Sequence, residues 1–133
     1  MGIGKLPNVS SPYEGGVVNN ASFVIGTENT NAITVNIQLK DGLKDVAQRV
    51  ALKAYLSADA NGDSLTALAT PTFAAGTDGV VSTLVSGKVI FMVSEADGDI
   101  DLVITYTTGA GTMYLVLVMP DGSLVVSGAI TFA

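Results

Sequence analysis

Apolar and polar residues alternate along two long segments of the chain. In residues 33–40 and 100–106, every second position is apolar and most positions between them are polar. The apolar positions are Ile33, Val35, Ile37 and Leu39 in the first segment, and Ile100, Leu102, Ile104 and Tyr106 in the second. Because successive side chains of a β-strand point to opposite sides, this period of two predicts two strands that each bury one face.

Further strands are predicted where β-branched and other apolar residues cluster, at 50–56, 80–85, 88–93, 113–119 and 124–132. The apolar residues between 43 and 54 also fit a helical stripe, so a short helix near 43–48 stays open. Residues 64–79 are small and polar, which indicates either a long connection or a weak edge strand.

The segment 113–119 (MYLVLVM) is apolar at every position. Such a run indicates a central strand that is buried on both faces. The turn pair Asp121-Gly122 predicts a hairpin to the last strand. The second face of these two strands carries more apolar residues than one small core uses, namely Val116, Val118, Val125 and Ala129. We expect this face to be covered by the N-terminal segment, by a copy of the chain or by another protein.

These segments predict an all-β fold, an antiparallel immunoglobulin-like β-sandwich of about seven strands over residues 21–133. Residues 1–20 lack periodicity and are rich in Gly and Pro, which indicates an extended N-terminal arm. The arm either docks on a partner or folds back onto its own domain. The arm residues expected to bind a partner are Ile3, Lys5, Leu6, Pro7, Val9 and Tyr13.

The composition narrows the function. Of the 133 residues, 48 % are hydrophobic and only 14 % are charged, and the chain has no His, Cys or Trp. Without imidazoles or thiolates, Ser-His-Asp triads, Cys nucleophiles, and haem or iron–sulfur ligation are excluded. The formal net charge of −6 argues against nucleic acid as a partner. No apolar run approaches the roughly 18 residues that cross a bilayer, so no membrane partner is expected. We expect no catalytic residues, no cofactor and no enzymatic activity.

Two acidic clusters have the alternating oxygen-bearing residues that calcium sites use. Asp59, Asn61 and Asp63 form one cluster, and four carboxylates alternate over residues 95–101 in the other. In alternating positions these oxygens can turn toward one hard cation. Both clusters also fit ordinary solvated turns, and the first departs from the EF-hand pattern at Ser64 and Thr70. The candidate calcium ligands are Asp59, Asn61, Asp63, Glu95, Asp97 and Asp99.

Two stretches, 50–63 (VALKAYLSADANGD) and the C-terminal third with SEADGDIDLVIT and YLVLVMPDGSLVVSGAITFA, carry a family resemblance. In strand texture and turn placement the chain resembles the small immunoglobulin-like β-sandwich structural proteins of tailed bacteriophage virions. These are capsid decoration (cement) proteins and modules of head or tail fibres. The resemblance covers about residues 31–133, and residues 1–20 lie outside it.

The resemblance implies a non-enzymatic virion protein that is made in the host cytoplasm and binds the surface of the assembled capsid. Its partner would be the major capsid protein or another virion protein, and a homo-oligomer is expected. A tail or fibre module is one alternative. Another is a calcium-stabilised adhesion or carbohydrate-binding sandwich, whose glycan platform would draw on Tyr13, Tyr55 and Tyr106.

Overall fold

Strands make up all the regular structure of the computed structural model, which describes residues 17–68 and 71–133. The described residues form ten strands and no helix. The first sheet holds β1 (Asn20–Ile25), β2 (Ala32–Asp41), β3 (Lys44–Asp45), β5 (Thr72–Ala75) and β8 (Asp99–Thr105). The second sheet holds β4 (Ala51–Ser57), β6 (Val80–Val85), β7 (Val89–Val93), β9 (Gly111–Val118) and β10 (Leu124–Phe132).

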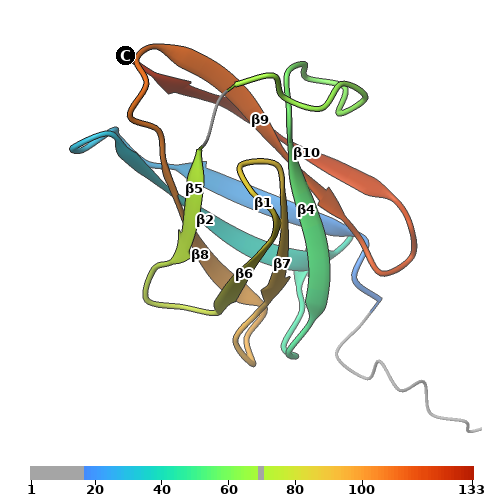
Figure 1. The fold of residues 1–133 in the computed structure, drawn as a ribbon. Coiled ribbons are helices and arrows are strands. Elements are labelled where there is room, and N and C mark those ends of the chain that lie inside the picture. Colours follow the sequence, from blue (N-terminus) through green and yellow to red (C-terminus); the bar gives the residue numbers. More distant parts are fainter. Residues whose placement is uncertain (1–16, 69–70) are drawn as a thin grey trace, which may run out of the picture.

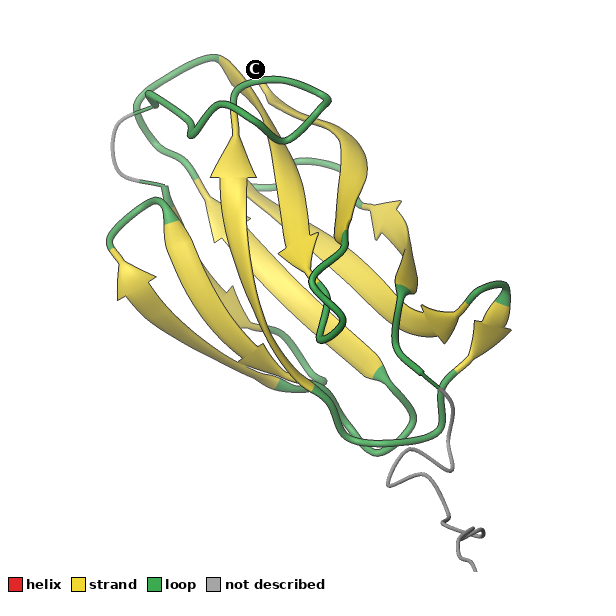
Figure 2. Cartoon of the chain, turned by 90° about the vertical axis from the view of Figure 1, so that its right-hand side faces the viewer, coloured by secondary structure: helices red, strands yellow, loops and turns green. Residues whose placement is uncertain are grey.

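The two sheets lie face to face as a β-sandwich (Figures 1 and 2). The first has the order β1-β2-β8-β5, with β3 paired to the end of β2, and the second has the order β10-β9-β4-β7-β6. All the pairings are antiparallel. Each of the two longest runs of alternation forms an interior strand of the first sheet, β2 and β8. The predicted antiparallel sandwich is therefore confirmed.

The expected number of about seven strands is too low, because the structure has three further strands. These are β1, with six residues, β5, with four, and β3, with two. A two-residue strand has no period to detect, and a four-residue strand lies at the lower limit of strand length. β5 lies within 64–79, and it fits the edge-strand interpretation of that segment. β3 occupies the region of the alternative short helix near 43–48, so the helix is wrong.

The core lies between the two sheets, where the inward apolar side chains of one sheet pack against those of the other. The inward residues of β2 are at most 2 % exposed, and those of β8 are fully buried. Fully burying such a side chain contributes about 1.5–3 kcal/mol to stability. Near the core's edge, the rings of Tyr106 and Phe132 meet edge to face, with centroids 5.7 Å apart.

The last strand does not keep one alternation along its whole length. A β-bulge interrupts the register between Val126 and Ala129, so the residues on either side of it follow different phases. Val125 pairs with Leu117 and packs against the core, which makes its expected place on the second face wrong. Its neighbour Val126 points outward in its place, opposite Val116.

The expected arm lies almost wholly outside the described residues. All six of its expected partner-binding residues, Ile3, Lys5, Leu6, Pro7, Val9 and Tyr13, fall in the part that is not described. Where the description begins, Val17 is half-exposed and Val18 is buried. The Asn19 N–H donates to the Lys40 carbonyl at 3.1 Å, which joins this segment to β2 directly before β1 starts.

Candidate functional sites on the two outer faces

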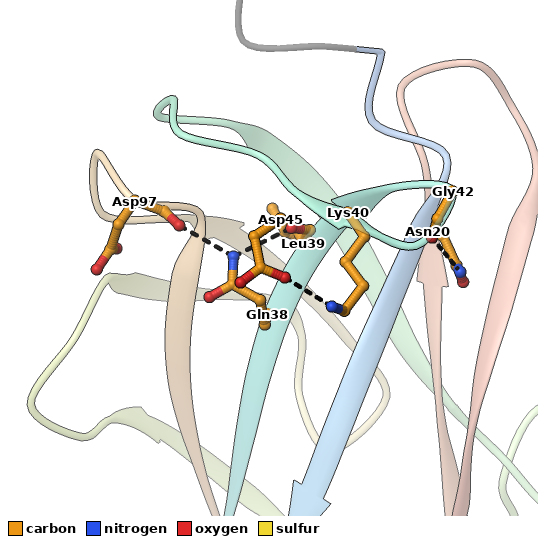
Figure 3. A network of polar contacts seen from close by, with 7 residues as sticks. All are labelled: Asn20, Gln38, Leu39, Lys40, Gly42, Asp45 and Asp97. Carbon is orange, nitrogen blue, oxygen red and sulfur yellow. Dashed lines mark hydrogen bonds and ion pairs between the residues drawn. The ribbon is translucent and has the colours of Figure 1, made fainter.

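The outer face of the first sheet is mostly polar, with Val24 on β1 as an exposed apolar residue. Strand β2 presents Thr34, Asn36, Gln38 and Lys40 on this side, because their neighbours in sequence point into the core. At one end of the sheet, Gln38 Nε2 donates to the carbonyls of Leu39 and Asp97 at 3.1 and 2.9 Å (Figure 3). Lys40 Nζ forms an ion pair with Asp45 at 2.6 Å in the same network. On this face, the polar side chains of Gln38 and Lys40 are therefore paired within the protein.

Three carboxylates gather on this polar face. Asp99 and Asp101 project from β8, and Asp78 reaches them from the connection between β5 and β6. Carboxylate oxygens of the three residues lie within 4.8 Å of one another. The backbone adds to the junction, because the Asp101 N–H donates to the Asp78 carbonyl at 2.9 Å. In the described residues this is the group of acidic side chains whose spacing could hold a metal ion.

The members of this cluster differ in their surroundings. Asp101 is buried and accepts hydrogen bonds from Asn36 Nδ2 and, at 2.5 Å, from Thr77 Oγ1. Burial, followed by a hydrogen bond with Asp78 and the charges of the neighbouring aspartates, raises the pKa of Asp99 to about 6. Like charges this close repel one another, so the cluster favours uptake of a proton.

The six predicted calcium ligands do not form one cluster, although the side chains of Asp59 and Asp63 contact each other. In the first loop, Asp59 Oδ1 accepts the backbone N–H groups of Asn61, Gly62 and Asp63 at 3.1, 2.9 and 3.4 Å. A hydrogen bond with the Asp63 side chain lowers the pKa of Asp59, and the same contact raises that of Asp63. Asp59 therefore orders its own turn, as aspartates often do.

In the second loop, Glu95 Oε2 accepts the Gly79 N–H at 3.1 Å, and Asp97 Oδ1 accepts the Asp99 N–H at 3.3 Å. Of the six predicted ligands, only Asp99 belongs to the three-carboxylate cluster. Asp101 was visible as part of the acidic run, but Asp78 lies about twenty positions earlier in the sequence, where no local spacing marks it. Calcium binding stays a prediction.

The outer face of the second sheet is apolar. Two rows of cross-strand neighbours show this most clearly. One row runs Val126, Val116, Tyr55 and Val89, and the next runs Leu124, Val118, Lys53, Phe91 and Ser82. Only Lys53 and Ser82 interrupt the apolar surface of these rows. Among the expected second-face residues, Val116, Val118 and Ala129 do lie on this side.

Part of this apolar face is covered by the chain itself. The loop that follows β4, residues 58–64, is closed by the Ser57–Leu65 bridge and folds over β9 and β10. A Cβ on Gly62 would lie 3.1 Å from Val116 and 3.2 Å from Val126. Gly62 has a φ of +79°, and its carbonyl accepts a hydrogen bond from the Tyr55 hydroxyl. Val116 is consequently fully buried although it points away from the core. The sequence does not predict that this loop covers Val116, because its residues are typical of an acidic turn.

The rest of the face stays open in the described residues. Val80 is 56 % exposed and Leu124 is 49 % exposed, while Phe91 and Val118 are half-buried between them. At the end of the sheet, next to Ala51, a pocket of about 290 Å³ opens. Its lining joins the start of the described chain to the second sheet and consists of Val17, Val18, Gln48, Arg49, Val50, Ala51, Pro120 and Asp121.

The proposed glycan platform loses one member. Tyr106 is only 6 % exposed and packs against Phe132, so its ring has no free face to offer a sugar. Tyr55 is half-buried beneath the loop that its hydroxyl holds, and Tyr13 lies outside the described residues. Tyr55 and Tyr106 therefore do not share an aromatic platform.

Comparisons with known proteins do not assign the chain to a family. No protein-family model matches the chain, and no curated protein is significantly similar to it. Within residues 17–68 and 71–133, no helix is long and apolar enough to cross a membrane. The functional argument therefore depends on the two outer faces.

Proposed function

We propose that this chain is a non-enzymatic structural protein that attaches to a larger protein assembly through the outer face of its second sheet. The observation that carries this proposal is the difference between the two outer faces, which is mostly polar on the first sheet and mostly apolar on the second. Exposed apolar patches on soluble domains mark places where another protein or segment packs. The polar face would then be the one that stays in water.

The resemblance to phage virion proteins suggests which assembly this is. Decoration proteins are small β-sandwiches that sit on a finished capsid, and the sequence of this chain shares their texture over about residues 31–133. A chain without His, Cys or Trp fits a role that needs surface and no reactive side chain. We therefore propose a capsid decoration protein, with the major capsid protein or another virion protein as its partner.

The proposal predicts how the domain sits on the shell. The second sheet would face the capsid, with Leu124, Phe91 and Val80 in the contact, and the cluster of Asp78, Asp99 and Asp101 would lie on the opposite side, away from the capsid. Burying the apolar side chains supplies the attraction, since apolar surface removed from water contributes about 25 cal/mol per Å².

The experiment is to purify phage particles produced by the genome that encodes the chain and to measure the chain's copy number relative to the major capsid protein. A fixed ratio on heads supports the proposal. Absence from the particles overturns it, and recovery with separated tails or fibres, without heads, replaces decoration by the tail or fibre alternative.

A matched pair of variants locates the contact. Val80→Lys with Leu124→Lys places two charges on the exposed apolar face, and Ser22→Lys with Val24→Lys places two on the exposed side of β1 in the other sheet. Stripped particles should rebind the second variant and lose the first, with both variants melting like the parent chain. Equal rebinding by both variants contradicts docking through the second sheet.

A further inference from the structure

The open part of the apolar face lies beside the point where the described chain begins. Val17 and Val18 line one pocket with Ala51, Pro120 and Asp121, at the end of the second sheet. Ala51 is the first residue of β4, and its outward neighbour along that strand is Lys53, in the middle of the open face. Sixteen residues precede Val17 in the sequence. Their attachment point is therefore at the border of the exposed apolar surface.

The preceding segment is long enough to cross this surface. Sixteen extended residues span about 50 Å, whereas five strands spaced by about 4.8 Å measure only about 20 Å from first to last. Because the segment is tethered next to the face, contact within one chain benefits from the high effective concentration of a short linker. A second copy has no such advantage in dilute solution.

The segment also has a chemistry that fits the face. Its residues at positions 3, 6, 9 and 12 are Ile, Leu, Val and Pro. In an extended polyproline II segment, which has three residues per turn, every third side chain lies along the same edge. The sequence thus provides one apolar edge, with Lys5 and Glu14 as its charged residues.

The charges complement each other as well. Lys53 is the charged side chain on the open rows of the face, and among the described residues no carboxylate forms an ion pair with it. Glu14 lies three residues before Val17, a reach of about 10 Å in extended chain. Lys53 lies two strand positions beyond Ala51, or about 7 Å. A carboxylate would therefore arrive near the face's unpaired ammonium group.

From this placement we infer that, in the free protein, residues 3–14 of the same chain cover the open outer face of the second sheet, with Glu14 at Lys53. The segment then caps the surface that the proposed function assigns to an assembly partner, and it gives way or is shared when that partner binds. The contact belongs to the unassembled protein. Its test is consequently independent of whether the chain binds a capsid.

Paramagnetic relaxation provides the test in the full chain. Because the sequence has no Cys, a single Ser82→Cys variant carries one spin label on the outer face of the second sheet, opposite Phe91. The matched control, Ser22→Cys, carries the label on the exposed side of β1. We expect the amide signals of residues 3–14, except Pro7 and Pro12, to lose intensity with the label at position 82 and to keep it with the label at position 22.

A mixed sample identifies whose segment makes the contact. Spin-labelled chain without isotope label is combined with isotope-labelled chain without spin label, so that only contacts between copies broaden signals. The inference expects no loss in the mixture. A loss that appears in the mixture assigns the face to a neighbouring copy and overturns it, and so does the absence of any loss in the single-species sample.

A variant of the segment supplies a second readout. Ile3→Ser, Leu6→Ser and Val9→Ser together remove the apolar edge without touching the described domain. We expect this triple variant to lose the broadening and to bind several-fold more of a dye that reports exposed apolar surface. The conservative triple Ile3→Leu, Leu6→Ile and Val9→Ile should keep both properties of the parent. Equal dye binding by the two triples contradicts the proposed cover.

Discussion

The two sheets of this sandwich have similar inner faces, but the side chains on their outer faces differ. Both sheets direct alternate apolar side chains into the same core, but outward β2 presents Thr34, Asn36 and Gln38 whereas β9 presents Tyr114, Val116 and Val118. Strict alternation thus identifies a strand with one face in water. Its loss identifies a strand whose outer face is apolar, whether a loop covers that face, as at Val116, or leaves it open, as at Phe91.

The difference has a local cause that can be followed in the structure. Over β9 and β10 the cover is a short loop centred on Gly62, whose missing side chain lets the backbone approach two valines. Beyond the loop, toward β7 and β6, the same apolar character continues without a cover in the described residues. One sheet face therefore holds a closed half and an open half.

The largest expected effect comes from exchanging the outward residues of the two faces. Val116→Thr keeps the shape of the side chain and places a hydroxyl under the Gly62 loop, where Val116 is fully buried, and it should cost about 2 kcal/mol. The reverse exchange, Thr34→Val on the polar face, should change stability by less than about 0.5 kcal/mol. Urea unfolding of both variants measures the contrast. Similar losses would mean that the two faces do not differ in burial.

The next effect isolates the loop. Gly62→Ala forces an L-residue to a φ of +79° and pushes a methyl group against Val116, which should cost about 1.5 kcal/mol. Gly122→Ala has a similar φ of +89° and no atom within 4 Å of the new Cβ, so it should cost about 1 kcal/mol. The gap between the two variants in urea unfolding measures the loop contact. A Gly62 variant no worse than the Gly122 variant contradicts it.

A third effect tests the carboxylates on the polar face. The pKa of Asp99 is raised to about 6, so the folded protein holds this proton more tightly than the unfolded chain does. Stability should therefore fall as pH rises from about 4 to 6, and the loss is complete above pH 6. Asp99→Asn removes this dependence and should stabilise the protein above pH 6 by about 1 kcal/mol, a value reduced for solvent screening.

Asp121 provides the control of opposite sign for this pH profile. Hydrogen bonds from Ser123 lower its pKa, so its contribution is present above the unfolded pKa and is lost as pH falls. Melting temperatures across the acidic range should therefore become flatter in Asp99→Asn and lose some of their acid sensitivity in Asp121→Asn. Parallel profiles for Asp99→Asn and the parent chain would contradict the cluster. The same melts with added calcium test the calcium prediction.

The inner faces could be predicted from sequence because they depend on residues a few positions apart. Alternation over 33–39 and 100–104 fixes which side chains of β2 and β8 enter the core. The bulge in β10 could not be seen, because it depends on Ser127, whose hydroxyl accepts the Leu115 N–H at 2.9 Å in place of a regular ladder partner.

The sites were harder to predict for the same physical reason. The acidic cluster needs Asp78, in the connection between β5 and β6, to meet Asp99 on β8. The cover over Val116 needs a loop to fold back on a sheet assembled from distant segments. The expected excess of apolar residues on a second face was nevertheless readable in the run 113–119. The composition of a strand thus indicates that its outer face is apolar, but it does not indicate which element will cover that face.

The smallest effect compares the two lysines that project from the two faces. Lys40 on the first sheet has its partner in Asp45 at 2.6 Å, and a double-mutant cycle with Lys40→Met and Asp45→Asn should give a coupling of about 0.5 kcal/mol. The proposed cap gives Lys53 a partner in Glu14. The corresponding cycle with Lys53→Met and Glu14→Gln should then give a coupling of similar size, weakened by added salt. Because a free segment would leave Lys53 solvated and uncoupled, a coupling of zero beside a measurable one at Lys40 would show that Glu14 does not pair with Lys53.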